Sequence, residues 1–218
     1  MSNKIKAVIF DLDGIIVDSE PLHFEAAKFA LKELGIDLTL EEYLQFGVAK
    51  GAKNLYEKIS EKYVVVIDMK RVFEVKNNKF QELFKMNVFP RKGIIEVIES
   101  FSGKYTLAIA SSGIRDNVIF VLEKINIKDK FSLIVTAEDV ARVKPFPDIY
   151  EKSCELLGLD KTECIAIEDS ETGVESAKGA GIRCIAVPCE FTKHQNFSKA
   201  DVVLDSFDKL NADFIKSF

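Results

Sequence analysis

The segment KAVIFDLDGIIVDSE, from Lys6 to Glu20, has an apolar run that ends in two aspartates, Asp11 and Asp13, followed directly by a glycine. Residues 5–10, IKAVIF, are apolar almost throughout, which is typical of a strand buried on both faces of a parallel sheet. Ligands bind beyond the carboxyl ends of the strands in such sheets. The two carboxylates therefore stand where a binding site is expected, and the glycine leaves room for a ligand to approach the backbone.

Five later segments have the same β-branched, apolar character, and helical patterns lie between them. The expected strands are residues 5–10, 105–110, 132–136, 164–168, 182–187 and 201–204. The expected helices are residues 93–101, 114–125, 147–157, 171–179 and 206–217. Because strands that alternate with helices form βαβ units, the fold class is predicted to be α/β, with a doubly wound parallel sheet of the Rossmann-like type.

The alternation stops between about residues 18 and 88. The segment 20–34, EPLHFEAAKFALKEL, has apolar residues at helical spacing, with Ser19 as a candidate N-cap and Pro21 in the first turn. Asp68 is a candidate cap for a second long helix. These patterns indicate a helical module inserted after the first strand.

The predicted domains are therefore an α-helical cap, residues 17–88, and a core made of residues 1–16 and 89–218. One cap segment, residues 63–68 (YVVVID), fits a helical module poorly. We expect a buried linker there, and the sequence gives no account of the role of Val64–Ile67.

Composition excludes several classes of protein. The 218 residues are 47% hydrophobic, enough for a substantial core, and the net charge of -5 argues against nucleic-acid and anionic-membrane partners. No apolar run reaches the length of a membrane helix, and aspartate comes too early for a signal peptide. The four cysteines lack CxxC spacing, so we interpret them as reduced, packed thiols of a cytoplasmic protein. We expect a monomer, because no large interaction segment stands out.

Polar residues follow three further strands at the same edge of the predicted sheet. Ser111 follows residues 105–110, Lys144 lies beyond residues 132–136, and Glu168 and Asp169 end the strand 164–168. Clustered carboxylates repel one another unless a cation joins them, and a set made only of oxygen ligands suits Mg²⁺. The sequence therefore predicts a magnesium site next to a hydroxyl and an ammonium group.

This set of groups suits phosphoryl transfer. A carboxylate can attack phosphorus and form an aspartyl phosphate, and the metal ion and a lysine ammonium screen the repulsion between the two anions. A second acid two residues later can protonate the leaving oxygen and then activate water. The SSG segment at a helix start offers a hydroxyl and backbone N–H groups to phosphate oxygens.

Four short segments, FDLDG, SSG, KPFPD and IEDS, resemble in that order the four motifs of the haloacid dehalogenase superfamily. The chain is most similar to the subgroup with a helical cap inserted after the first motif, which includes β-phosphoglucomutase. The resemblance covers nearly the whole chain. It implies that Asp11 is the nucleophile and Asp13 the general acid/base, and that both are Mg²⁺ ligands, Asp13 through its backbone carbonyl.

The resemblance also implies roles for the other motif residues. Ser111 and the Ser112 amide would hold the phosphoryl group. Lys144, before a cis Lys-Pro bond, would bridge nucleophile and phosphate. Glu168 and Asp169 would complete the Mg²⁺ site. The implied substrate is a small phosphorylated molecule that enters between cap and core.

Cap residues are implied as substrate contacts, each with a structural alternative. His23 and Lys76 match a histidine and a lysine of the family cap, although an apolar helix often packs a histidine and lysines often face solvent. Lys50 stands where β-phosphoglucomutase has an arginine that grips the distal phosphate. Gly47 and Gly51 flank Lys50 and are expected to loosen this loop for the approach of a substrate. Arg115 is expected at the rim of the site.

Two activities share all these core residues. We favour a phosphatase that hydrolyses a sugar phosphate, because Lys50 keeps the charge of the arginine but loses its two-pronged hydrogen bonding. The alternative is a phosphomutase, and the aliphatic Ile15 after DLDG tilts mildly toward it. A catalytically inactive binding module and a dehalogenase are disfavoured by the intact acid pairs. Taken singly, DLDG is also compatible with a turn, EDS with a helix N-cap and Lys144 with a solvated lysine.

Overall fold

The computed structural model describes residues 4–48 and 51–218, and the chain forms two compact units. Met1–Asp18 together with Phe89–Phe218 make one unit, and Ser19–Val88 make the other. We call them the core unit and the inserted unit and describe each by itself. The division into a cap domain, residues 17–88, and a core domain, residues 1–16 and 89–218, stays a prediction.

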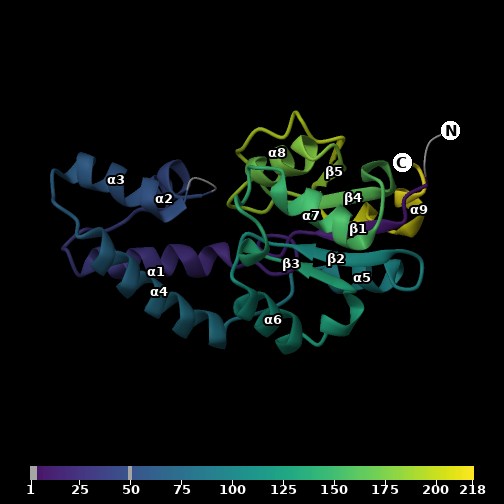
Figure 1. Cartoon of the computed structure of the whole chain (residues 1–218). Coiled ribbons are helices and arrows are strands. Elements are labelled where there is room, and N and C mark those ends of the chain that lie inside the picture. Colours follow the sequence, from purple (N-terminus) through teal and green to yellow (C-terminus); the bar gives the residue numbers. More distant parts are fainter. Residues whose placement is uncertain (1–3, 49–50) are drawn as a thin grey trace. The chain divides into compact units, whose positions relative to one another are not determined.

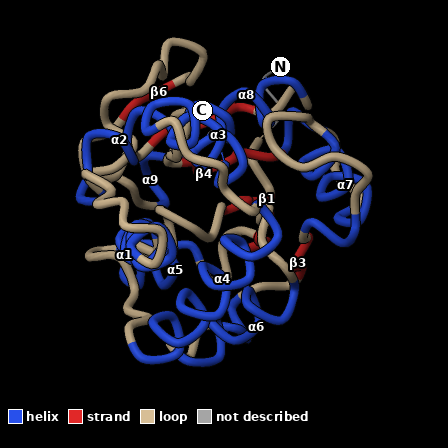
Figure 2. Tube along the Cα trace, turned by 90° about the vertical axis from the view of Figure 1, so that its left-hand side faces the viewer, coloured by secondary structure: helices blue, strands red, loops and turns tan. Residues whose placement is uncertain are grey.

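The core unit is built on a parallel sheet. Its strands are β1 (Ala7–Phe10), β2 (Thr106–Ala110), β3 (Leu133–Val135), β4 (Cys164–Glu168), β5 (Arg183–Ala186) and β6 (Val202–Val203). Within the described residues they form a six-stranded sheet in the order β3-β2-β1-β4-β5-β6. In Figure 2 the labelled strands run from β3 at the lower right through β1 and β4 to β6 at the upper left. All six predicted strands are confirmed.

Four helices cover the two faces of this sheet. The helices α7 (Asp148–Leu157) and α8 (Glu171–Gly179) lie on one face, and α5 (Ile94–Phe101) and α6 (Arg115–Lys124) lie on the other (Figure 1). The predicted doubly wound α/β fold is therefore confirmed. Because Phe10 is level with both Ile109 and Ile167, the residues that follow these three positions meet at the carboxyl edge of the sheet.

The predicted helix over residues 206–217 is wrong. The segment contains a 3₁₀ turn at Phe207–Lys209 and a short helix, α9 (Ala212–Ile215). Asn211 separates the two, because its backbone is extended and its side chain accepts hydrogen bonds from the amides of Asp213 and Phe214. A side chain that caps the next helix in this way interrupts a continuous one.

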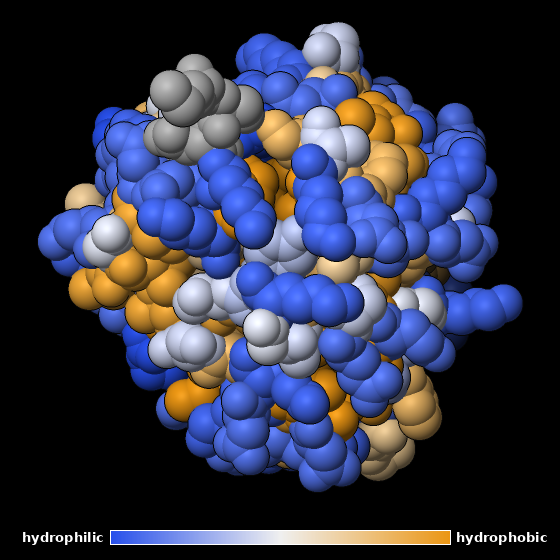
Figure 3. Space-filling model, turned by 90° about the vertical axis from the view of Figure 1, so that its right-hand side faces the viewer, coloured by the Kyte–Doolittle hydropathy of each residue, from blue (hydrophilic) through white to orange (hydrophobic). Residues whose placement is uncertain are grey.

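The interior of the core unit confirms a packing role for the cysteines. Cys154, Cys164 and Cys184 belong to one buried cluster between the sheet and the helices α7 and α8, and Cys189 is buried as well. The surface at the end of the core unit where the strands begin, opposite the carboxyl edge of the sheet, is mainly hydrophilic (Figure 3). Polar side chains separate the hydrophobic areas on this surface.

The inserted unit is helical, as predicted. It contains α1 (Glu20–Lys32), α2 (Leu40–Phe46), α3 (Gly51–Tyr63) and α4 (Met69–Met86), with α1 packed against α4. Pro21 lies in the first turn of α1, and the Asp68 side chain caps α4 by accepting a hydrogen bond from the Arg71 amide at 3.1 Å. Ser19 occupies the N-cap position of α1, but its side chain makes no capping hydrogen bond there.

The connection between α3 and α4 corrects the expectation of a buried linker. Val64 and Val66 are 90% and 98% exposed, and only Ile67 is buried. Ser60 accounts for this arrangement, because its carbonyl accepts from the Val65 amide at 3.1 Å and its hydroxyl donates to the Val65 carbonyl at 2.5 Å. The two hydrogen bonds tie Val65 to the end of α3, so that its neighbours point outward.

Among the helices that the structure describes, none combines the length and the apolar character needed to cross a lipid bilayer.

Candidate active site

The loop after β1 begins the site. The Asp11 amide donates to the Ile167 carbonyl at 3.0 Å, so the sheet ladder continues up to the first acid of the DLDG motif. The chain then turns at Gly14, whose φ of +77° favours glycine. A Cβ atom at this position would lie 2.1 Å from Oδ2 of Asp169. Gly14 therefore allows the carboxylate of Asp169 to lie directly against the first loop.

Three carboxylates meet at the carboxyl edge of the sheet. Asp11, Glu168 and Asp169 each place one oxygen within 4.8 Å of the others, and all three residues are buried. Among the described atoms, Oε2 of Glu168 is buried and has no hydrogen-bond partner. A buried anionic oxygen without a donor is costly unless a cation binds it. The set of ligand oxygens therefore fits a divalent metal ion.

Lys144 connects two of these acids. Its Nζ atom lies 2.5 Å from Oδ1 of Asp11 and 2.7 Å from Oε1 of Glu168, and it also donates to the Ala110 carbonyl at 2.9 Å. Burial lowers the pKa of Lys144, but the charges of the two carboxylates and the hydrogen bonds to them together raise it by more, so the net shift is upward. The ammonium group thus stays charged inside the cluster and holds Asp11 and Glu168 in fixed positions.

The loop that carries Lys144 is held from both sides. The Lys144–Pro145 peptide bond is cis, as the family resemblance implied. Arg142 makes two hydrogen bonds to the Asp148 carboxylate, at 2.8 and 3.1 Å. The buried hydroxyl of Ser176, on α8, donates to the Phe146 carbonyl at 2.6 Å. These contacts fix the backbone on both sides of the lysine.

A second loop contributes residues that the sequence analysis missed. After β5, the Thr192 hydroxyl lies 3.3 Å from Oδ2 of Asp169, and Sγ of Cys189 lies 3.5 Å from the same oxygen. The only sequence signal for them was their position after a strand, because the loop after β5 also leaves the carboxyl edge of the sheet. Nothing in the segment CEFT resembles a motif.

The arginine Arg91 ties these two loops together. Its guanidinium donates to the carbonyl of Gly14, to that of Val187 at 2.7 Å and to that of Pro188 at 2.6 Å. Its own amide donates to the Ile16 carbonyl at 2.8 Å. The loop with the DLDG motif and the loop after β5 are therefore joined by one side chain of the core unit.

The SSG segment lies beside the second acid of the DLDG motif. The buried Ser111 hydroxyl accepts a hydrogen bond from the Gly113 amide at 3.0 Å. A Cβ atom on Gly113 would lie 3.1 Å from Oγ of Ser111 and 4.0 Å from Oδ2 of Asp13. Both polar groups thus border Gly113, and Ser112 is exposed next to them.

Arg115 makes its contacts with acidic residues of the segment after β3. Its guanidinium forms an ion pair with Asp139, and its amide donates to Oε2 of Glu138 at 3.0 Å. These contacts direct the side chain toward the turn at Ala137–Asp139.

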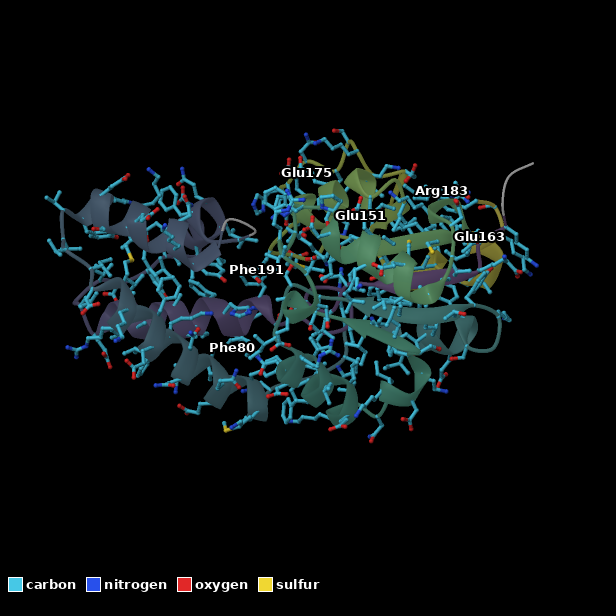
Figure 4. All side chains as sticks on the ribbon, in the orientation of Figure 1. Phe80, Glu151, Glu163, Glu175, Arg183 and Phe191 are labelled. Atoms are coloured by element: carbon cyan, nitrogen blue, oxygen red, sulfur yellow. The ribbon has the colours of Figure 1, made fainter. Side chains whose placement is uncertain are left out.

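The inserted unit brings His23 and Lys76 together. Nδ1 of His23 lies 3.0 Å from the Lys76 ammonium, and the imidazole stacks on the Phe80 ring with a centroid distance of 4.0 Å. Phe80 is labelled in Figure 4, between α1 and α4. Gly47 ends α2, where a Cβ atom would approach the Tyr43 carbonyl to 2.9 Å. Lys50 lies outside the described residues.

We expect His23 to stay neutral over the physiological pH range. Burial first, and then the Lys76 charge, lower its pKa from 6.5 to about 3. Because the ammonium can only donate, Nδ1 accepts and the proton resides on Nε2. Imidazole ¹⁵N NMR should show this tautomer down to about pH 4, with the second histidine identified by a His194→Gln variant.

The same shift makes the inserted unit less stable in acid. The unfolded chain binds a proton near pH 6.5 that the folded chain refuses until about pH 3, so stability falls as the pH drops through this range. Charging of His23 near pH 6.5 in the folded protein would contradict the assignment.

Comparison with known proteins identifies the family. A family model described as haloacid dehalogenase-like hydrolase matches residues 8–187. The chain belongs to the haloacid dehalogenase-like hydrolases. It is 32% identical over 219 residues to protein CbbY of Cereibacter sphaeroides, an alignment that covers 94% of each chain. It is 34% identical over 185 residues to a phosphorylated carbohydrates phosphatase of Thermotoga maritima, with 83% and 84% covered.

A solved structure extends this likeness to the fold. CbbY from Rhodobacter sphaeroides in complex with phosphate has a TM-score of 0.82 and 29% identity, and the alignment covers 98% of this chain and all of that one. Family membership, the fold and the phosphatase relatives together make this haloacid dehalogenase-like protein a phosphoryl-transfer hydrolase.

Proposed function

We propose that this hydrolase is a Mg²⁺-dependent phosphatase that acts on a small phosphorylated metabolite, with sugar phosphates as the favoured class, through an aspartyl phosphate at Asp11. The observation that carries the proposal is the buried ion pair at 2.5 Å between Lys144 and Asp11, set among two further carboxylates. An aspartate held by a lysine beside a cation site is oriented and electrostatically prepared to attack a phosphate.

The metal part of the proposal rests on the donor set. Asp11, Glu168, Asp169 and the backbone carbonyl of Asp13 would hold Mg²⁺. When bound, the ion would supply positive charge to the transferring phosphoryl group. Hard oxygen ligands favour Mg²⁺ over thiophilic metals, and Glu168 has an oxygen that the described protein atoms leave without a donor.

Side chains of the protein carry out the two chemical steps of the proposed reaction. The Asp11 carboxylate attacks phosphorus while Asp13 donates a proton to the leaving oxygen. Asp13 then takes a proton from water, and the water oxygen attacks the phosphorus of the aspartyl phosphate, which releases inorganic phosphate and restores Asp11. Ser111 and the Ser112 amide hold phosphoryl oxygens in both steps.

Substrate contacts outside the core motifs are also proposals. His23, with a proton on Nε2, and the Lys76 ammonium offer donors to a polar substrate, and we assign Gly47 and Lys50 to the same task. Arg115 would have to leave Asp139 before it could bind a substrate phosphate.

The names of the relatives favour hydrolysis of phosphorylated sugars. One is a phosphorylated carbohydrates phosphatase, and a second has been solved with phosphate bound. Transfer of the phosphoryl group to a second sugar phosphate would use the same core residues. Phosphomutase activity is therefore the alternative that the assay must distinguish from hydrolysis. The four buried cysteines suit the reducing conditions of a cytoplasmic location, which is part of the proposal.

One assay read in two ways tests the proposed function. The protein with Mg²⁺ is given a panel of sugar phosphates, including β-glucose 1-phosphate with a trace of glucose 1,6-bisphosphate, and released phosphate and isomerised sugar phosphate are measured in the same tubes. We expect phosphate without isomer, and reversible loss of activity with EDTA. Isomer formation with little phosphate would establish the mutase, and activity indifferent to EDTA would exclude the metal.

A further inference from the structure

Tyr150 brings a buried hydroxyl to the acid cluster from outside the four motifs. The residue lies in the first turn of α7 and is fully buried. Its hydroxyl donates to Oε1 of Glu168 at 2.5 Å, and the Lys144 ammonium lies 5.4 Å from the centre of its ring. A buried tyrosine hydroxyl needs a partner, and here the partner is a carboxylate of the candidate metal site.

The two oxygens of Glu168 have different surroundings. Oε1 accepts from Tyr150 at 2.5 Å and pairs with Lys144 at 2.7 Å. Oε2, by contrast, receives no hydrogen bond from any described atom. It lies against Gly173, where a Cβ atom would come within 1.9 Å. Two donors on one oxygen restrict the rotation of the carboxylate and leave the other oxygen available.

We propose that Tyr150 is a positioning residue for the metal site: by holding Oε1 of Glu168, it presents Oε2 to the divalent cation and increases the affinity for it. This inference rests on the proposed function. Hydrogen bonds to metal-binding carboxylates orient these ligands, and their loss typically weakens metal binding by about 10- to 100-fold.

The placement of Tyr150 makes this role specific. Tyr150 lies two residues after Asp148, whose carboxylate accepts a hydrogen bond from Arg142. In the same segment the Phe146 carbonyl accepts a hydrogen bond from Ser176. The segment 142–150 thus carries both donors of Oε1, Lys144 and Tyr150, on a backbone that is fixed between them. Lys144 is shared with Asp11, whereas the hydroxyl of Tyr150 donates to Glu168.

The test is a Tyr150→Phe variant, which keeps the ring and removes the hydroxyl. Mg²⁺ and Mn²⁺ affinities are measured on the substrate-free protein by calorimetry, and Mn²⁺ binding also by electron paramagnetic resonance. We expect the Kd for both ions to rise about tenfold or more, with kcat at saturating metal changed much less than the metal concentration needed for half activity. The matched control is Tyr105→Phe, whose hydroxyl donates at 3.1 Å to the Ala212 carbonyl in the core unit. This control should bind metal like the wild type.

Thermal unfolding separates positioning from a purely structural role. If Tyr150 positions Glu168, the metal-free variant unfolds close to the wild-type Tm and gains less Tm on addition of Mg²⁺. A lower metal-free Tm with an undiminished metal-induced gain, or an unchanged Kd, would overturn the inference and leave the proposed function standing. If the wild type neither binds Mg²⁺ nor hydrolyses phosphate esters, the proposed function fails, and this inference fails with it.

Discussion

Asp11→Asn should reduce phosphatase turnover by at least about 10³-fold and leave the fold intact. The amide has the size of the carboxylate but cannot attack phosphorus, so the aspartyl phosphate cannot form. It also removes a negative charge, 2.5 Å from the Lys144 ammonium, that repels the substrate phosphate, so the loss should appear in kcat and not in substrate binding. The measurement is kcat and kcat/KM on the best substrate of the panel, with circular dichroism and Tm as the check on folding.

The comparison variant for this prediction is Asp205→Asn. Asp205 is an exposed aspartate of the core unit, and its substitution should leave kcat within about twofold of the wild type, because surface changes away from a site have small effects. Substantial turnover by a folded Asp11→Asn protein would remove Asp11 from the nucleophile role.

Gly173→Ala should weaken metal binding at least about tenfold and lower activity at limiting Mg²⁺ by about 100-fold. The added Cβ would lie 1.9 Å from Oε2 and 2.2 Å from the carboxyl carbon of Glu168, so the carboxylate must move. Exchange of glycine for alanine inside a helix normally stabilises a protein by about 0.5–1 kcal/mol. The expected loss of metal affinity therefore arises from the displaced oxygen of Glu168. The helical propensity of alanine, taken alone, would stabilise the protein.

The same helix supplies the matched control. A Cβ atom on Gly179, the last residue of α8, would meet Pro147 at an ordinary contact distance of 3.5 Å. Gly179→Ala should therefore keep wild-type metal affinity and activity. Calorimetry with Mg²⁺ and the phosphate assay at several metal concentrations measure both variants. Equal metal affinity in the two variants would mean that Oε2 of Glu168 does not bind the ion.

The sequence predicts the sheet and the acid cluster because both depend on local signals. Apolar runs define the strands, and parallel strands bring their carboxyl ends to one edge, so the sequence alone places Asp11, Glu168 and Asp169 together. Lys144 could be assigned to the same site because it begins the KPFPD motif. Its ion pair with Glu168 was not indicated by the sequence, and the implied bridge from Asp11 to a substrate phosphate stays a prediction.

Other parts of the site depend on tertiary contacts that have no sequence pattern. Tyr150 looks like a core residue of an amphipathic helix, and only the packing of α7 on the sheet shows that its hydroxyl reaches Glu168. Thr192 and Cys189 reach Asp169 from a loop 20 or more residues further along the chain. Arg91 joins three carbonyls from two loops, and a single arginine in a sequence gives no sign of such an arrangement.

The wrong helix over residues 206–217 and the wrong burial expected for residues 63–68 have a common cause, which is hydrogen bonding by short polar side chains. Asn211 caps a new helix inside a segment whose apolar spacing indicated one helix. Ser60 fastens Val65 to the end of α3 and leaves two valines exposed where their hydrophobicity indicated burial. In both cases one short polar side chain that hydrogen-bonds to the backbone decides against the apolar pattern.

The most direct test of the central claim is to trap the phosphorylated enzyme. The protein is mixed with a ³²P-labelled substrate and Mg²⁺, quenched in acid within the first turnover, and its peptides are mapped for the label. The account predicts an acid-stable, base-labile phosphoryl group on Asp11, which is absent from the Asp11→Asn variant. Label on another residue, or no protein-bound label during turnover, would contradict an aspartyl phosphate at Asp11.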